Sequence, residues 1–397
     1  MSRFLSKASE SLLPYTPGEQ PQGRKFIKLN TNECPYPPSP KVAEAILAGY
    51  EEIAAGCGTA GAAGRAEKAD CGCDAGATEA GKMAEKVAQI MPPELANLRL
   101  YSDPEERVLI EAIAAHYRVG TNQVIAGNGS DEILGFAFRA FCDSEAPLQF
   151  ADLTYGFYPA LCGLYGIPFR VVPLEEDFTL NIEPYKNCGN NVIIANPNAP
   201  TGMNLPLSAI EEVDRVVMVD EAYVDFGGES CVSLLPKYEN LVIIQTFSKS
   251  RSLAGARVGF AIANPELIAD MNRIKYSFNP YNVNRLSILA GAAAMRDWDY
   301  TKECTGRICK TREKTTEALR ALGFTVLDSK TNFIFAKSGD MPGKVYFDGL
   351  REAGILVRRW DSERIKDYVR ISIGSEEEME TFVKETEKLV EAARKGR

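Results

Sequence analysis

The stretch LVIIQTFSKSRSLAGARVG, residues 241–259, decides the fold of this chain and contains its most reactive side chain. The apolar run at residues 241–244 has the length and the β-branched content of a buried strand. It ends in a polar cluster that contains Lys249, and Arg257 follows just before a second apolar run at residues 258–263. We therefore expect Lys249 at the end of a buried strand, where partial burial favours a nucleophilic amine.

Other short apolar runs alternate with helical patterns and extend the predicted sheet. They fall at residues 123–126, 192–195 and 216–219. Continuous apolar strands that alternate with helices are typical of a mostly parallel sheet covered on both faces. Beyond about residue 285 the order changes to a long polar helix followed by mixed strands and helices. The predicted fold class is α/β, with a mostly parallel central sheet in a large domain and a smaller α+β C-terminal domain.

Composition and element order divide the chain into four predicted segments. Residues 1–50 form an N-terminal arm and part of the small domain, and residues 51–93 form a Gly-, Ala- and Cys-rich insertion. Residues 94–285 form the large domain, and residues 286–397 form the small C-terminal domain. The insertion has few aromatic or β-branched residues, so we expect a flexible or loosely helical surface segment. Its cysteines lack the spacing of a metal site.

The bulk composition argues against several kinds of partner. The formal net charge is -9 and the sequence pI is about 5.1, with no basic stripe, which argues against nucleic-acid and anionic-membrane partners. No apolar run resembles a signal peptide or a membrane span, so we expect a cytoplasmic protein. The single histidine, His116, lies in a helical pattern and excludes a zinc site with several His ligands. The ten cysteines are scattered, which indicates free thiols.

Polar residues follow the predicted strands, at the edge of a parallel sheet where ligands collect. The turn GNGSDE, residues 127–132, leads into a helix and offers free N–H groups to a phosphate, although an ordinary helix cap has the same pattern. The turn NPNAPTG, residues 196–202, is rigid and fixes further polar groups. Asp220 ends another apolar strand, where a carboxylate needs a cationic partner unless it caps the next helix.

One ligand accounts for these groups together. Pyridoxal 5′-phosphate needs a lysine for a Schiff base, an acid for its ring nitrogen, a phosphate cradle, an arginine for the phosphate and an aromatic ring. The chain supplies them, in that order, as Lys249, Asp220, the turn at residues 127–132, Arg257 and Tyr155. Taken alone, Lys249 would be an ordinary surface lysine, so the combination of groups predicts the cofactor.

The order of the motifs GNGSDE, LTYGFY, NPNAPTG, VDEAYVDF, TFSKS and LAGARVG resembles that of the fold-type I pyridoxal-phosphate aminotransferases. The opening LNTNECPYPPSP, the YSDP at residues 101–104 and the late VRISIG are similar to the histidinol-phosphate aminotransferase family in particular. The resemblance covers the chain except residues 52–92. It implies transfer of an amino group between L-histidinol phosphate and 2-oxoglutarate in histidine biosynthesis, by a homodimer with shared active sites.

The resemblance also assigns a role to each matching residue. Lys249 would bond to the cofactor, Asp220 would pair with its ring nitrogen, and Tyr223 would contact its phenolic oxygen. Tyr155 would lie against the ring face. The phosphate would be held by Gly129, Ser130, Ser248, Arg257 and, from the other subunit, Tyr101. The substrate would be surrounded by Tyr15, Asn32, Arg358 and Arg370, whose two guanidinium groups suit its phosphate or the glutamate carboxylate.

One position departs from the family pattern. The family usually has Asn directly before the Pro-Thr-Gly of the rigid turn, where it contacts the cofactor's phenolic oxygen, and this chain has Ala199. We expect either that Tyr223 acts alone or that neighbouring Asn198 takes this cofactor-binding role.

The same motifs are compatible with two other enzymes. A lyase resembling threonine-phosphate decarboxylase would release carbon dioxide and form no glutamate. An aromatic amino acid aminotransferase would need a pocket for a flat ring, as a histidinol-phosphate aminotransferase does. A cofactor-binding regulator ranks last, because no helix-turn-helix or basic segment precedes the motifs.

Overall fold

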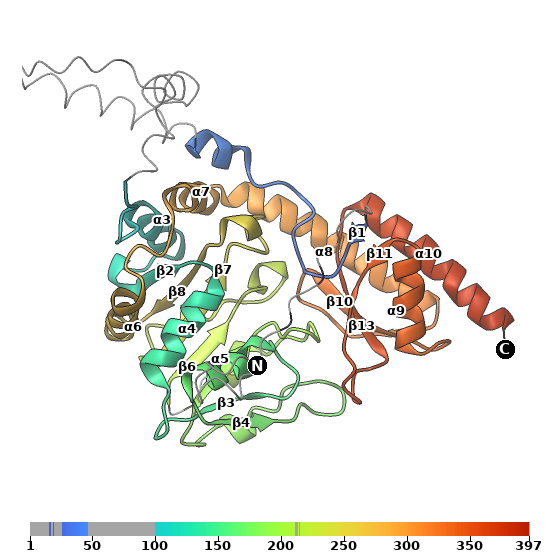
Figure 1. Cartoon of the computed structure of the whole chain (residues 1–397), viewed down its shortest axis with the longest axis horizontal. Helices are drawn as coiled ribbons and strands as arrows, with labels where there is room; N and C mark the ends of the chain where they lie inside the picture. The colour runs from blue at the N-terminus through green and yellow to red at the C-terminus, as the bar shows by residue number, and fades with distance from the viewer. Residues whose placement is uncertain are drawn as a thin grey trace, which may run out of the picture.

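A seven-stranded sheet forms the centre of the large half of the molecule (Figure 1). The computed structural model describes residues 26–46, 100–210 and 215–396, with the single residues 16, 19 and 213. In order across the large sheet, the strands are β2 (Val124–Gly127), β8 (Gly259–Ala263), β7 (Leu241–Thr246), β6 (Val217–Asp220), β5 (Asn191–Ala195), β3 (Leu148–Ala151) and β4 (Phe169–Val172). Strand β8 runs antiparallel to both of its neighbours, and the other pairs are parallel. The predicted mostly parallel sheet is confirmed.

Strict alternation along the central strands builds a core on both faces of the large sheet. One face carries Met218, Val242 and Ile244 under the helices α4 (Ser130–Phe141), α5 (Phe157–Tyr165) and α6 (Pro265–Phe278). On the other face, Phe260 and Ile262 pack with α3 (Arg107–Tyr117) and α7 (Arg285–Arg296). Because Asp220 is two residues after Met218, its side chain points to the face that α4 and α5 cover.

A smaller antiparallel sheet lies in the C-terminal part of the chain. Its strands, in order, are β12 (Arg358–Arg359), β13 (Tyr368–Ser372), β10 (Phe333–Ser338) and β9 (Phe324–Val326). The helices of this part are α8 (Trp298–Ala321), α9 (Gly343–Glu352) and α10 (Glu376–Lys395), and α8 runs from beside α7 to the small sheet (Figure 1). This mixed architecture agrees with the predicted α+β part.

The N-terminal segment returns to the C-terminal part of the chain. Strand β1 (Ile27–Lys28) pairs in parallel with β11 (Ile355–Leu356), and residues 40–46 are helical. Strand β1 ends after two residues, and a turn follows it. The predicted domain boundaries stay a prediction, and the insertion at residues 51–93 lies outside the described residues.

The cysteines and the single histidine can be located in the fold. The seven cysteines in the described part of the chain are free thiols, and Cys57, Cys71 and Cys73 lie outside it. His116 packs edge-on against Tyr117 and Trp298, and burial lowers its pKa. Among the described residues, no cluster of His, Cys, Asp or Glu side chains could hold a metal ion. None of the described helices has the length and apolar character needed to cross a membrane.

Candidate active site

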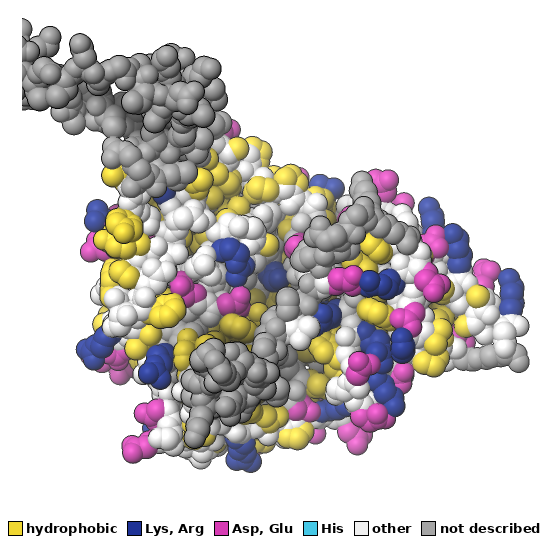
Figure 2. Space-filling model, viewed as in Figure 1, with side chains coloured by type: hydrophobic (Ala, Val, Ile, Leu, Met, Phe, Trp, Pro, Cys, Tyr) yellow, Lys and Arg dark blue, Asp and Glu magenta, His cyan; other side chains and the backbone are white. Residues whose placement is uncertain are grey.

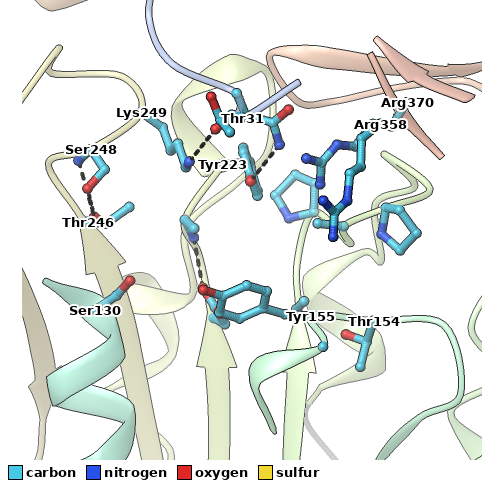
Figure 3. A pocket seen from close by; sticks show the side chains of 18 of the residues that line it. Thr31, Ser130, Thr154, Tyr155, Tyr223, Thr246, Ser248, Lys249, Arg358 and Arg370 are labelled. Atoms are coloured by element: carbon cyan, nitrogen blue, oxygen red, sulfur yellow. Dashed lines mark hydrogen bonds between the residues drawn. The ribbon is translucent and has the colours of Figure 1, made fainter. Parts of the chain in front are cut away.

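A cavity of about 510 Å³ lies at the carboxyl ends of the central strands, between the large and small sheets. Ala195, Asp220 and Thr246, at the ends of β5, β6 and β7, line it from the large sheet. Arg358 and Arg370 line it from the small sheet. Figure 3 shows Ser130, Thr246 and Ser248 on one side, the two arginines on the opposite side, and Lys249 with Tyr223 between them. The cavity therefore has side chains suited to an anion at each end.

Asp220 is a buried carboxylate with neutral hydrogen-bond partners. Its Oδ2 accepts a hydrogen bond from the Tyr158 hydroxyl at 2.8 Å, and its Oδ1 accepts one from the Ala222 N–H at 3.1 Å. Burial raises the pKa of Asp220 to about 6, while these two hydrogen bonds oppose the rise. A carboxylate in this position is suited to a cationic partner that enters the cavity.

Lys249 follows β7 in the turn predicted from the sequence, and its amine points into the cavity (Figure 3). Its Nζ donates to the carbonyl oxygen of Thr31 at 3.2 Å and lies 5.8 Å from the centre of the Tyr223 ring. The amine therefore faces two elements at once, the turn after β1 and the turn after β6.

The turn between β2 and α4 and the start of β8 together form a tight cradle for an anion. Gly129 has a φ of 86°, and a side chain there would meet the guanidinium group of Arg257. A side chain at Gly259 would meet the N–H of Ser130 in the first turn of α4. The cradle therefore combines backbone N–H groups, the positive end of a helix and a guanidinium group.

Side-chain hydrogen bonds fix the guanidinium group and the aromatic ring beside this cradle. Arg257 contacts the Asp131 carboxylate at 3.1 Å and the Ser248 hydroxyl at 3.4 Å. The Tyr155 hydroxyl donates to the other carboxylate oxygen of Asp131 at 2.9 Å. Asp131 therefore places Arg257 and Tyr155 on the same side of the cavity.

Arg358 and Arg370 face each other across the pair β12–β13. The indole ring of Trp360 lies 5.7 Å from the guanidinium carbon of Arg358 and 5.4 Å from that of Arg370. Phe333 lies 5.3 Å from the Arg370 guanidinium carbon. Aromatic faces attract guanidinium groups, so Trp360 stabilises two like charges held side by side. Such a pair suits a phosphate or a carboxylate.

The remaining predicted residues have other environments. Asn198 does not line the cavity; its amide donates to the carbonyl oxygen of Leu153 and to the Thr201 hydroxyl, both at 2.9 Å. Ala199 does line it. Tyr101 is 77% exposed in this chain and is not part of the cavity lining. Tyr15 lies outside the described residues.

Two residues of the site did not emerge from the sequence. Tyr158 lies in the first turn of α5 and Tyr155 lies just before that helix, so two tyrosines three residues apart are the available signal for Tyr158. Trp360 lies two residues after Arg358, a spacing that places two side chains on the same face of an extended chain. Neither spacing is specific enough to predict a role without the fold.

These groups fit one cofactor. A lysine amine, a buried carboxylate and a cradle closed by glycines surround a single cavity at the carboxyl edge of a mostly parallel sheet. The aldehyde, ring nitrogen and phosphate of pyridoxal 5′-phosphate need these three groups. The fold and the site define a pyridoxal-phosphate-dependent enzyme.

Comparisons with known proteins identify the family. The sequence profile of aminotransferase class I and II matches residues 78–385. The histidinol-phosphate aminotransferase of Clostridium botulinum (strain Langeland) is 43% identical over 395 residues, which cover 98% of this chain and 99% of that protein. The protein of the same name from Brachyspira hyodysenteriae is 42% identical, with 98% of this chain and 99% of the relative covered. The chain belongs to the class I and II aminotransferases.

A solved structure has the same fold. The crystal structure of histidinol-phosphate aminotransferase from Sinorhizobium meliloti in complex with pyridoxal-5′-phosphate aligns with a TM-score of 0.77. The alignment covers 99% of both chains at 22% sequence identity. It supports the predicted fold class, with its large and small parts.

Proposed function

We propose that this chain transfers an amino group between L-histidinol phosphate and 2-oxoglutarate, with pyridoxal 5′-phosphate as its cofactor. The observation that carries the proposal is near full-length identity of 43% to a histidinol-phosphate aminotransferase, in a chain whose cavity has an anion site at each end. One end suits the cofactor's phosphate and the other suits the phosphate of the substrate.

The cofactor end is formed by residues that bind and orient. Ser130, Ser248 and Arg257 hold the phosphate, and Asp220 holds the ring by its nitrogen. Tyr155 would lie against the ring face, and Tyr101 of a second subunit would complete the phosphate site. When bound, the cofactor supplies an aromatic system that withdraws electrons from bonds at the substrate's α-carbon.

Lys249 carries out the proton transfer. Its amine would hold the cofactor covalently until a substrate amine takes its place. Lys249 Nζ would then be the base that takes the proton from the substrate's α-carbon. The short distance from Nζ to the Thr31 carbonyl oxygen, 3.2 Å, supports this role, because the carbonyl accepts the amine's hydrogen and orients it.

Arg358 and Arg370 bind the substrate's anionic group. Histidinol phosphate offers a phosphate and glutamate offers a carboxylate, and a pair of guanidinium groups can bind either one. Asn32 and Tyr15 are proposed to complete the substrate site.

We also propose that the enzyme is a homodimer that works in the cytoplasm. Large apolar side chains are exposed near α3 and α6, and we call them the aromatic patch: Leu100, Tyr101, Tyr276, Phe278 and Tyr281. The Tyr101 and Tyr281 rings are stacked with centroids 4.4 Å apart, which presents a rigid surface to a second copy. Figure 2 shows apolar side chains over this side of the molecule, at the left of the view.

The test is a substrate panel with the purified, cofactor-loaded enzyme. Histidinol phosphate and 2-oxoglutarate should yield glutamate, with a kcat/KM far above that for phenylalanine. Release of carbon dioxide from threonine phosphate without glutamate would indicate the lyase instead. A preference for phenylalanine would indicate an aromatic amino acid aminotransferase.

A further inference from the structure

Asn32 lies in the turn after β1 and has an unusual backbone conformation for a buried side chain. Its φ is 55°, in the left-handed region, and only 1% of the residue is exposed. Asparagine tolerates this region better than most residues, but the conformation still costs free energy. The surrounding hydrogen bonds must hold the residue there.

Four hydrogen bonds connect Asn32 to three other segments of the chain. Its Nδ2 lies 2.9 Å from the Tyr223 hydroxyl, and its Oδ1 lies 2.7 Å from the Ser372 hydroxyl. Its own N–H donates to the same Ser372 oxygen at 2.9 Å, and its carbonyl oxygen accepts from Asn332 Nδ2 at 3.0 Å. Ser372 and Asn332 belong to the small half, whereas Tyr223 follows β6 of the large sheet.

This network fixes the direction of each proton. Because the Ser372 oxygen already accepts the Asn32 N–H, its own proton is free to go to Oδ1 of Asn32. The amide nitrogen of Asn32 therefore faces Tyr223, and an amide nitrogen can only donate. The Tyr223 oxygen must accept this hydrogen bond, so its own proton is available for another acceptor.

The groups around the Tyr223 ring indicate that an acceptor for its hydroxyl proton would lie in the cavity. Phe333 packs edge-on against the ring with centroids 5.1 Å apart, and Lys249 Nζ lies 5.8 Å from its centre. Burial acts to raise the pKa of Asp220 and of Glu33, and the charge of Lys249 acts to lower both. Tyr223 itself lines the cavity, and Ala199 on the opposite turn offers no polar side chain.

We propose that Asn32 is a positioning residue, which orients the Tyr223 hydroxyl so that its proton points into the cavity towards the phenolic oxygen of the bound cofactor. It acts through Tyr223 and links that orientation to the small half through Ser372. The inference rests on the proposed function only in requiring that the cofactor binds, and it gives Asn32 a second role beside the proposed substrate contact.

The test measures the absorbance of the cofactor-loaded enzyme as a function of pH. A donor to the phenolic oxygen stabilises its negative charge, so the nitrogen that joins Lys249 to the cofactor loses its proton at lower pH. Asn32→Gly removes the amide while retaining the left-handed conformation. The pH at the midpoint of the absorbance change should rise by about 0.5 to 1 pH unit, which corresponds to the loss of one neutral hydrogen bond.

A double-mutant cycle separates this role from a general structural one. Tyr223→Phe should raise the midpoint further than Asn32→Gly, and Asn32→Gly should add nothing in the Tyr223→Phe background. Ser372→Ala, which keeps Asn32 but frees its amide to rotate, should give a smaller rise in the same direction.

Two results would overturn the inference. One is an Asn32→Gly midpoint equal to that of the unmodified enzyme, at full cofactor occupancy. The other is a shift that persists undiminished in the Tyr223→Phe background. A wild type that binds the cofactor but makes no glutamate from histidinol phosphate would contradict the proposed function and leave this spectral test intact.

Discussion

At the scale of single residues, the proposed function makes turnover depend most directly on Lys249. Under that proposal, substitution by alanine removes both the amine that binds the cofactor and the base that moves the proton. We expect Lys249→Ala to reduce kcat by at least about 10²- to 10⁴-fold, the usual contribution of one acid–base group. The measurement is glutamate formation together with the visible absorbance of the purified protein. Retention of both by the variant would contradict the assignment.

As the proposed partner of the cofactor's ring nitrogen, Asp220 should make cofactor binding depend on pH. The proposed attraction exists only while this carboxylate is ionised, and burial raises its pKa to about 6. Affinity for the cofactor should therefore be constant above that pH and fall below it, by about tenfold per pH unit for one proton. The measurement is the dissociation constant from pH 5 to pH 8.

Tyr158 supplies the control for this pH dependence. Its hydroxyl stabilises the ionised form of Asp220, so Tyr158→Phe should raise the pKa of the carboxylate and move the affinity loss to higher pH. Tyr346→Phe, which changes a buried hydroxyl in the small half, should leave the midpoint unchanged. An unshifted midpoint in Tyr158→Phe would show that this hydrogen bond does not tune Asp220.

At the scale of secondary-structure elements, a buried ion pair joins the residue before α3 to the end of α6. Lys275 Nζ lies 2.6 Å from both carboxylate oxygens of Glu106, and both side chains are 2% exposed. Burial raises the pKa of Glu106 to about 7, against the lowering effect of Lys275. The two charges compensate each other, so removing only one of them leaves an unpaired buried charge.

Lys275→Met should therefore destabilise the protein by about 3–5 kcal/mol at pH 8. The loss should shrink as the pH falls, because Glu106 without its partner takes up a proton and loses its charge. Glu106→Gln combined with Lys275→Met should recover most of the stability. Lys344→Met is the matched control: it breaks the exposed pair with Asp348 and should cost no more than about 1 kcal/mol. Urea unfolding at two pH values measures the stability of the unmodified protein and of these three variants. An equal loss of stability at both pH values in Lys275→Met would contradict the charge argument.

The elements also differ in how well the sequence predicts them. Strands β5, β6 and β7 are continuous apolar runs, and each is predicted within two residues of its ends. The sequence pattern does not predict strands β3 and β4: β3 contains the buried Gln149, and three of the four β4 residues are exposed at the edge of the sheet. Local patterns of apolar residues identify central strands, whereas an edge strand is defined by its neighbour.

The same limit applies to the site. Lys249, Asp220 and the glycine turn are recognisable because each follows a predicted strand, and parallel strands bring their ends together. The hydrogen bonds of Asn32 reach Tyr223 and Ser372, which lie 191 and 340 positions further along the chain. Only the assembled fold brings these residues together. Its chemistry was visible in the sequence, but its partners were not.

At the scale of the whole molecule, the aromatic patch should hold two subunits together. Tyr101 and Phe278 are each 77% exposed, more than any other large apolar side chain in the described part of the chain. Phe278→Glu should weaken the dimer by about 30-fold or more, as expected for an aromatic anchor replaced by a charge. Sedimentation velocity measures the change.

A matched substitution separates this effect from a general surface effect. Val345→Glu changes a side chain that is 56% exposed on α9 and should leave the dimer intact. If Tyr101 completes the partner's phosphate site, the Phe278→Glu protein should also bind the cofactor more weakly. A Phe278→Glu protein that remains a dimer would exclude the patch as the interface.

The turn after β1 reaches Lys249 and Arg370 through its main chain. The carbonyl oxygen of Thr31 accepts from Lys249, and that of Asn30 accepts from Arg370 at 3.1 Å. Every amino acid carries this carbonyl group, so replacing either side chain leaves both acceptors in place. Substitutions at residues 30 and 31, which line the cavity, should therefore reshape it while Lys249 and Arg370 keep their main-chain partners.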